Sequence, residues 1–134
     1  MQKKVLTTCG FCGCGCNFYL GVEDNIVTAV YPSTSHPISH GKLCIKGWQG
    51  HEFVNSPERL KAPLIRRNGK LKETSWDEAY SLIASKLTQI KMQHGSNSIA
   101  VLTSGKCTNE ENYLLQKFAR VVIGTNNIDH CARL

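Results

Sequence analysis

Cysteine spacing constrains this chain more than any other feature of its sequence. Cys9, Cys12 and Cys16 form a C-x2-C-x3-C group, and Cys44 follows after 27 intervening residues. Three cysteines in a tight loop and a remote fourth suit a cubane iron–sulfur cluster, because the loop reaches three irons and the distant residue reaches the last one. The chain has seven cysteines, an odd number that argues against a disulfide framework. Their clustering favours metal chemistry in a reducing compartment.

Other kinds of site share parts of this pattern. A zinc site usually combines two close Cys or His pairs, whereas this chain has one C-x2-C pair, with His36 and His40 near Cys44. A radical S-adenosylmethionine site has the reverse spacing, C-x3-C-x2-C, and the ferredoxin pattern C-x2-C-x2-C-x3-C-P is absent. Cysteines that bind no metal are the remaining alternative. Cys14 forms competing C-x-C pairs with its neighbours, and we interpret it as a bystander.

Small and basic residues accompany the cysteines. Gly10, Gly13 and Gly15 lie between them, and small residues let backbone N–H groups approach the sulfurs of a cluster. Lys42 and Lys46 flank the fourth cysteine, where their charges offset the negative charge of the thiolates.

The composition is that of a folded chain of modest size. Its 134 residues, 41% hydrophobic and 19% charged, suffice for one ordinary domain or two very small ones. There is no run of about 18 apolar residues and no apolar signal segment at the start, so we expect a cytoplasmic protein without a membrane span. The net charge is +6, and the nearest approach to a basic cluster comprises Arg66, Arg67, Lys70 and Lys72. We interpret this cluster as a solvated surface or docking edge, and expect no nucleic acid partner.

The first part of the chain, residues 1–60, is predicted to be a cysteine-rich β lobe. Residues 18–22 and 26–31 are rich in β-branched and aromatic side chains, which favours two strands. Asp24-Asn25 supplies the turn of a small hairpin between them. Prolines and glycines predict a loop over residues 32–47.

The second part, residues 61–134, is predicted to begin an α/β domain. A capping box of Ser75 and Glu78 starts an amphipathic helix that Gly95 ends. A short strand of the buried type follows at residues 99–103.

The same order of elements then repeats. Thr108 and Glu111 form a second capping box, for a helix that ends at Gly124, and residues 127–130 begin another strand. Helix, strand, helix and strand in this order imply a parallel α/β unit with a right-handed crossover. Two strands leave open sheet edges, so we expect this part to need more chain or a partner. The predicted fold class is α/β: a small β-rich lobe followed by the beginning of a parallel α/β domain.

Several segments carry a family resemblance, in order and over nearly the whole chain. They are the C-x2-C-x3-C-x27-C group, Gly41–Gly47 (G-x-x-C-x-K-G), Pro57–Leu64 (P-x-R-L-x-x-P-L), Ser75–Ala79 (S-W-D-E-A), Asn109–Arg120 (N-E-x-N-Y…K-x-A-R), Gly124–Asp129 (G-T-N-N-[IV]-D) and Cys131–Leu134 (C-A-R-[LV]). Together they resemble the molybdopterin oxidoreductases of the dimethyl-sulfoxide-reductase superfamily. The last segment most resembles the catalytic subunits of formate dehydrogenases.

The resemblance implies two cofactors. It places a [4Fe–4S] cluster on Cys9, Cys12, Cys16 and Cys44, and molybdenum or tungsten on two molybdopterin guanine dinucleotides. Lys46 matches a lysine that lies between cluster and pterin and helps electrons to pass. A cation there stabilises the more negative, reduced state and can hydrogen-bond both groups.

A turn in the second part is the expected pterin contact. Residues 104–109 follow the first strand of the α/β unit, at the edge of the sheet where ligands usually bind. Cys107, Thr108 and Asn109 are the candidates there, and a plain helix cap explains Thr108 equally well.

The reaction implied is the reversible interconversion of formate and carbon dioxide, in a longer chain, because this segment alone is not expected to be catalytic. The expected partner is a ferredoxin-like iron–sulfur subunit or a hydrogenase of a larger, anaerobic complex. The alternatives are another oxidoreductase of the superfamily, such as a nitrate reductase, a non-catalytic electron-transfer subunit, or a zinc-binding module.

In this family the metal-binding side chain, cysteine or selenocysteine, directly follows C-A-R-[LV]. The sequence ends at that point, with Leu134. One hypothesis is that a UGA codon for selenocysteine comes next, and the alternative is an arbitrary fragment boundary. Cys131 lies too early to be this ligand, and we expect it to be structural.

Overall fold

A computed structural model describes residues 1–131 and divides the chain into two compact units. The first unit contains Met1–Arg59, Thr103–Tyr113 and the chain from His130 onward. The second contains Leu60–Leu102 and Leu114–Asp129. The expected domain boundary after residue 60 stays a prediction about the complete protein. The last three positions of the C-A-R-L motif lie outside the described residues.

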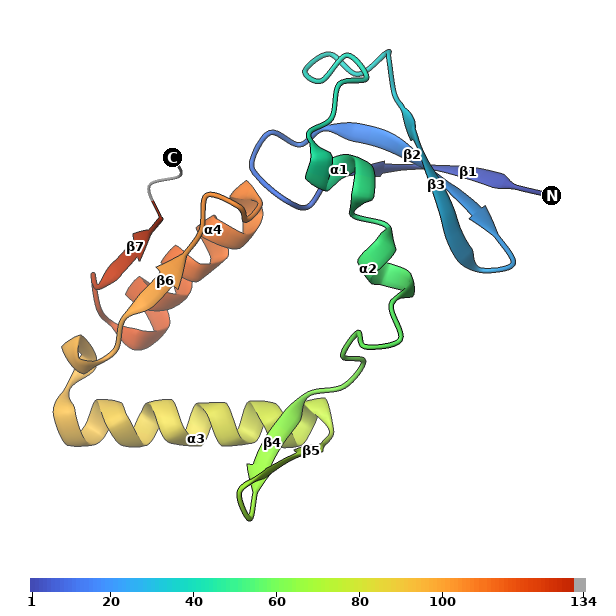
Figure 1. Ribbon diagram of the computed structural model, residues 1–134. Coiled ribbons are helices and arrows are strands. Elements are labelled where there is room, and N and C mark those ends of the chain that lie inside the picture. Colours follow the sequence, from blue (N-terminus) through green and yellow to red (C-terminus); the bar gives the residue numbers. More distant parts are fainter. Residues whose placement is uncertain (132–134) are drawn as a thin grey trace. The chain divides into compact units, whose positions relative to one another are not determined.

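The first unit is built on a three-stranded antiparallel sheet (Figure 1). Its strands are β1 (Lys3–Thr8), β2 (Asn17–Glu23) and β3 (Ile26–Pro32), in the order β1-β2-β3. Asp24 and Asn25 both have positive φ, 49° and 61°, which suits the tight turn of a hairpin. The predicted hairpin is therefore confirmed, and β1 adds a third strand beside it.

Two short helices follow the sheet, α1 (Ile45–Gln49) and α2 (Glu52–Asn55). The prediction of a loop over residues 32–47 was wrong at its end, where α1 begins. Gly47 suggested a helix break, but it is buried in α1, where an added Cβ would lie 3.2 Å from the Cβ of Leu43. The glycine permits close packing at this point.

The second unit begins with a hairpin that the sequence analysis missed. Strands β4 (Leu64–Arg67) and β5 (Lys70–Glu73) are joined by Asn68 and Gly69, whose φ angles are 51° and 78°. Asn-Gly between two short runs is a strong hairpin signal, so the signal was present. The basic cluster expected to be solvated lies on this hairpin, and its side chains are exposed.

Helix α3 (Trp76–His94) follows, with the predicted ends. The Ser75 hydroxyl accepts a hydrogen bond from the Glu78 N–H at 3.2 Å, and Gly95 ends the helix with φ of 82°. Much of its apolar stripe is exposed, including Tyr80 and Ile83. Within residues 1–131, no helix combines the length and apolar character that crossing a bilayer requires.

The remaining elements form the predicted strand–helix–strand unit. A 3-10 turn, η1 (Ser96–Ser98), leads to β6 (Val101–Thr103), α4 (Asn109–Lys117), a π-helical segment η2 (Phe118–Ile123) and β7 (Ile128–His130). Strands β6 and β7 pair, and their arrows point the same way in Figure 1. Helix α4 and η2 thus form the crossover of a parallel pair, as predicted. The buried side chains of η2 are Ala119 and Ile123.

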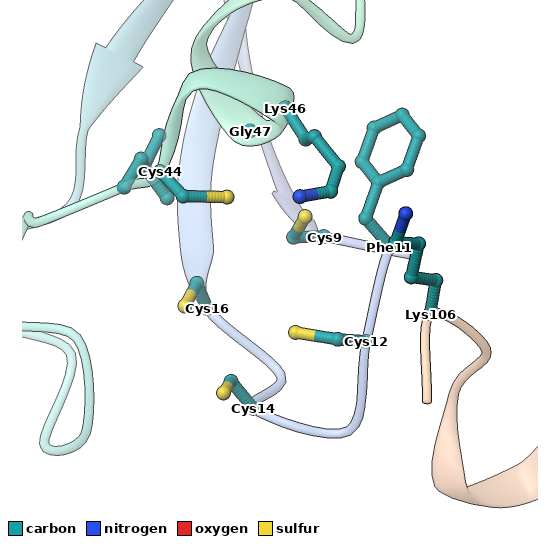
Figure 2. Close-up of a pocket in the computed structure, with 10 residues that line it drawn as sticks. Cys9, Phe11, Cys12, Cys14, Cys16, Cys44, Lys46, Gly47 and Lys106 are labelled. Carbon is teal, nitrogen blue, oxygen red and sulfur yellow. The ribbon is translucent and has the colours of Figure 1, made fainter. Parts of the chain in front are cut away.

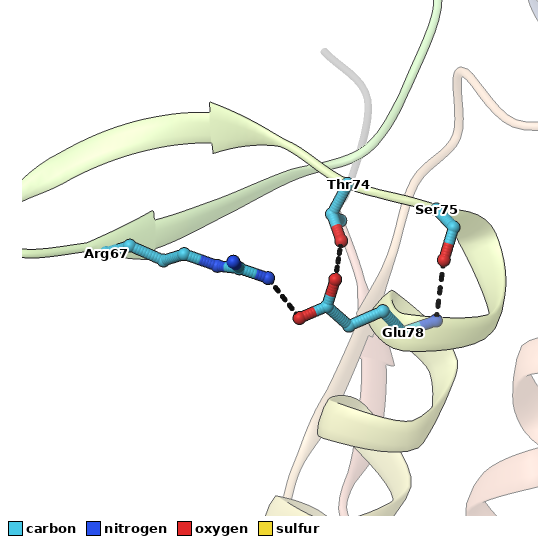
Figure 3. A network of polar contacts seen from close by, with 4 residues as sticks. All are labelled: Arg67, Thr74, Ser75 and Glu78. Atoms are coloured by element: carbon cyan, nitrogen blue, oxygen red, sulfur yellow. Dashed lines mark hydrogen bonds and ion pairs between the residues drawn. The ribbon is translucent and has the colours of Figure 1, made fainter.

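A polar network joins the β4–β5 hairpin to the start of α3 (Figure 3). The Glu78 carboxylate forms an ion pair with Arg67 and accepts a hydrogen bond from the Thr74 hydroxyl. The Thr74 hydrogen bond, followed by the Arg67 charge, lowers the pKa of Glu78. The network therefore favours the ionised carboxylate.

This network predicts a pH-dependent contribution to stability. Because the pKa of Glu78 is lower in the folded state, the carboxylate stabilises the fold at neutral pH, and this contribution disappears as the pH falls through the folded-state pKa. We expect Glu78→Gln to lower the melting temperature modestly at pH 7, with the difference closing in acid. Thermal melts of the variant and of Glu73→Gln, outside this network, test this. An equal loss at both pH values for Glu78→Gln would contradict it.

Candidate metal centre

The cysteine motif lines a cavity of about 400 Å³ in the first unit (Figure 2). Its walls come from the loop between β1 and β2, from the start of α1 and from the turn between β6 and α4. The lining residues are Cys9, Phe11, Cys12, Cys14, Cys16, Leu43, Cys44, Lys46, Gly47 and Lys106. The spacing noted in the sequence thus corresponds to one shared space, to which all four predicted cluster ligands contribute.

The loop between β1 and β2 brings three of these cysteines together. The Cys9 N–H donates a hydrogen bond to the Cys16 carbonyl at 2.8 Å, directly beyond the last pair of the β1–β2 ladder, Thr8 and Asn17. This bond closes the loop at its neck. Gly15 has φ of +61°, a conformation that glycine adopts without strain. The loop is therefore a compact turn that extends the sheet.

Cys44 reaches the cavity from the opposite wall. It precedes the first residue of α1, where unpaired backbone N–H groups gather. The N–H of Gly47 lowers the pKa of the Cys44 thiol, with further help from the N–H and the charge of Lys46. The start of α1 therefore favours the thiolate, the form of cysteine that binds metals.

Cys16 shows the opposite effect. Burial raises the pKa of its thiol, and the negative charges of Cys9, Cys12 and Cys44 raise it further. Several thiolates around one cavity repel each other, so their ionisation needs a cationic group among them. This donor set fits an iron–sulfur cluster, whose irons are cationic and whose protein ligands are thiolates.

The size of the cavity also bears on the choice of metal. About 400 Å³ is many times the volume of roughly 30 Å³ that one water molecule occupies in the liquid. Among residues 1–131, no three His, Cys, Asp or Glu side chains are placed to share one metal ion. His36 and His40, the histidines near Cys44 in the sequence, do not line the cavity, and His36 Nδ1 lies 2.9 Å from Ser39 Oγ instead. The space suits a multi-atom cluster.

The two lysines that flank Cys44 in sequence are placed differently. Lys46 lines the cavity, and Figure 2 shows its ammonium group pointing into it, whereas Lys42 is not part of the wall. An aromatic contact supports the wall nearby: the Phe11 ring lies edge-on to Phe53 at a centroid distance of 6.1 Å. A Cβ on Gly50 would lie 2.6 Å from the Phe11 ring, so only glycine fits there.

The predicted pterin candidates lie in and just after the β6–α4 turn. Thr108 caps α4, since its hydroxyl oxygen accepts a hydrogen bond from the Glu111 N–H at 3.2 Å, and its own N–H donates to the Glu111 carboxylate at 2.7 Å. The Asn109 amide donates to the Gly13 carbonyl at 3.3 Å, and Cys107 is half-buried. Two of the three side chains thus have protein partners, and contact with a pterin stays a prediction.

Cys131 lies against the same turn. Its sulfur accepts a hydrogen bond from the Gly105 N–H at 3.2 Å and lies 3.4 Å from the Ser104 hydroxyl. The hydroxyl contact, followed by the N–H, lowers the pKa of the Cys131 thiol. These contacts hold Cys131 against the turn.

Three residues that line the cavity were not among the site residues predicted from the sequence. Cys14, interpreted above as a bystander, lines the cavity with the four predicted ligands. Phe11 lies inside the motif, but nothing in the spacing marks its side chain. Lys106 comes from a segment distant in sequence, and only the fold brings it to the cavity.

Several curated proteins of high similarity are named formate dehydrogenases. The chain is 51% identical over 128 residues to the F420-dependent formate dehydrogenase 1 subunit alpha of Methanococcus maripaludis, with 96% of this chain and 18% of that protein covered. It is 47% identical over 131 residues to the putative formate dehydrogenase YrhE of Bacillus subtilis, with 98% and 13% covered. The chain therefore spans less than a fifth of the length of these relatives.

A solved structure shows the same fold. Acetylene hydratase from Pelobacter acetylenicus superposes with a TM-score of 0.74 at 23% identity, over 96% of this chain and 18% of that one.

Family comparisons cover both parts of the chain. Residues 2–56 match the molybdopterin oxidoreductase Fe4S4 domain, and residues 59–134 match the molybdopterin oxidoreductase family itself. The cofactors are accordingly a [4Fe–4S] cluster and a molybdopterin. The cysteine-lined cavity, the fold and these matches agree, and the chain belongs to the molybdopterin oxidoreductase family.

Proposed function

We propose that this chain is the N-terminal part of the catalytic alpha subunit of a formate dehydrogenase, which interconverts formate and carbon dioxide. The observation that carries the proposal is the cavity in which Cys9, Cys12, Cys16, Cys44 and Lys46 meet. The assignment of formate as the substrate rests on the 45–51% identity, over nearly the whole chain, to proteins named formate dehydrogenases.

In this proposal the four cysteines bind the [4Fe–4S] cluster and Lys46 supplies a positive charge beside it. The metal–pterin group, molybdenum or tungsten on two molybdopterin guanine dinucleotides, supplies the two-electron chemistry, and the cluster supplies one-electron transfer. Lys46 holds its ammonium in the cavity, where the charge favours the more negative, reduced cluster. Cys107, Thr108 and Asn109 remain the proposed residues nearest the pterin.

The electron partner and the setting are also proposals. The expected acceptor is a ferredoxin-like iron–sulfur subunit or a hydrogenase in a larger complex, and the relatives named F420-dependent add F420 to these. The close spacing of the cysteines in the C-x2-C-x3-C group suits metal binding in a reducing compartment, which supports a cytoplasmic, anaerobic enzyme. Analysis of the complete, anaerobically purified enzyme for molybdenum, tungsten and selenium tests the identity of the metal and the selenocysteine hypothesis.

Substitution of single cysteines tests the ligand set. We expect Cys44→Ser to remove most of the bound iron and the visible absorbance of the cluster, because a hydroxyl is a poor replacement for a thiolate ligand. Cys14→Ser is the matched control, since Cys14 lines the same cavity without a proposed bond to iron. Loss of iron in Cys14→Ser with retention in Cys44→Ser would contradict the assignment.

Substrate specificity has a separate test. We expect the complete enzyme to reduce a viologen dye with formate as the electron donor, and Lys46→Ala to slow this reduction at least tenfold while iron content is unchanged, because electron exit is impaired. Assays with formate and with nitrate distinguish the proposal from the nitrate reductase alternative. Turnover of nitrate without turnover of formate would reject the substrate while leaving the family assignment intact.

A further inference from the structure

The cavity has a second lysine in its wall that no sequence motif marks. Lys106 lies in the turn between β6 and α4 and reaches the cavity from the side of Phe11 and Cys12 (Figure 2). Lys46 enters from α1. Two lysines from segments far apart in sequence therefore line one space that is also lined by thiols.

The turn that carries Lys106 is held in a defined conformation. The Cys107 N–H donates to the Ser104 carbonyl at 3.1 Å, and the Lys106 N–H donates to the Ser104 hydroxyl at 3.1 Å. The Asn112 amide donates to the same carbonyl at 3.2 Å. The backbone at Lys106 is thereby fixed by its own turn and by α4.

A direct contact fastens the start of α4 to the cysteine loop. The Asn109 amide donates to the Gly13 carbonyl at 3.3 Å. A Cβ on Gly13 would lie only 2.4 Å from Asn109 Oδ1, so a larger residue would displace the Asn109 side chain from this contact. A glycine at position 13 thus leaves room for the Asn109 side chain.

We propose that Lys106 is a second cation of the cluster site, and that the contact between Asn109 and Gly13 positions it against the cysteine loop. This inference rests on the proposed cluster ligands. Reduction adds an electron to a cluster already surrounded by four thiolates, and a nearby cation stabilises this more negative state. Lys106 therefore raises the reduction potential of the cluster, as Lys46 does from α1.

Redox titration of the complete enzyme, followed by electron paramagnetic resonance of the reduced cluster, tests the charge effect. We expect Lys106→Gln to weaken the electron affinity of the cluster about tenfold, a negative shift of roughly 59 mV for one electron. Lys106→Arg keeps the charge and should stay near the wild-type potential. Lys42→Gln is the control, because Lys42 lies two residues from Cys44 but outside the cavity wall. A shift in Lys106→Gln no larger than that in Lys42→Gln would overturn the proposal.

The positioning contact has its own variants. Asn109→Ala and Gly13→Ala both disturb the contact, and each should shift the potential in the same direction as Lys106→Gln at unchanged iron content. The shift in the double variant Asn109→Ala/Lys106→Gln should then be smaller than the sum of the single shifts, because both changes act through one charge. Additive shifts would overturn the role of Asn109.

Failure of this inference can be told apart from failure of the proposed function. Wild-type enzyme without a cluster would remove the ligand assignment itself. A cluster that is present in the wild type, with a reduction potential that does not change in Lys106→Gln, would disprove only the role of this lysine.

Discussion

Repulsion among clustered thiolates is the constraint on which the rest of this structure depends. At Cys16, burial raises the pKa of the thiol most, and the charges of Cys9, Cys12 and Cys44 raise it further. Several thiolates can stay ionised side by side only when a cationic group lies among them and hydrogen-bond donors or positive charges surround them. The surrounding elements supply such donors: the start of α1 stabilises the Cys44 thiolate, and Lys46 and Lys106 border the cavity.

The scaffold holds these groups with few hydrogen bonds. The backbone hydrogen bond from Cys9 to Cys16 closes the cysteine loop at the end of the sheet, so three of the four predicted cluster ligands lie on a short extension of β1 and β2. The hydrogen bond from the Asn109 amide to the Gly13 carbonyl joins this loop to the start of α4. The N-terminal cluster segment and the turn expected near the pterin thus belong to one compact unit, which suits a path for electrons between two cofactors.

Local signals in the sequence predicted much of this fold. Ser75 and Gly95 bound α3 as expected, and Asp24-Asn25 marked the hairpin, because caps and tight turns depend on neighbouring residues. The Asn68-Gly69 hairpin carried an equally local signal and was overlooked. Helix α1 could not be recognised, since five residues carry no periodic pattern and Gly47 suggests a break.

The full lining of the cavity could not be predicted without knowledge of the fold. Cysteine spacing indicated four ligands, but the presence of Lys106 in the wall depends on tertiary packing between segments far apart in sequence. The same holds for Gly13, whose neighbour Asn109 is 96 residues away. From the sequence, Gly13 was expected to let backbone N–H groups approach the cluster. The structure adds a contact between Gly13 and the Asn109 side chain.

The central claim is that this cavity binds one iron–sulfur cubane. Chemical analysis of the anaerobically purified, complete enzyme for iron and acid-labile sulfide, resolved by Mössbauer spectroscopy into cluster types, tests it most directly. The account predicts a cluster of about four irons and four sulfides that is lost when Cys9, Cys12, Cys16 or Cys44 is replaced. A single zinc ion bound by these cysteines, with no iron at the site, would contradict it.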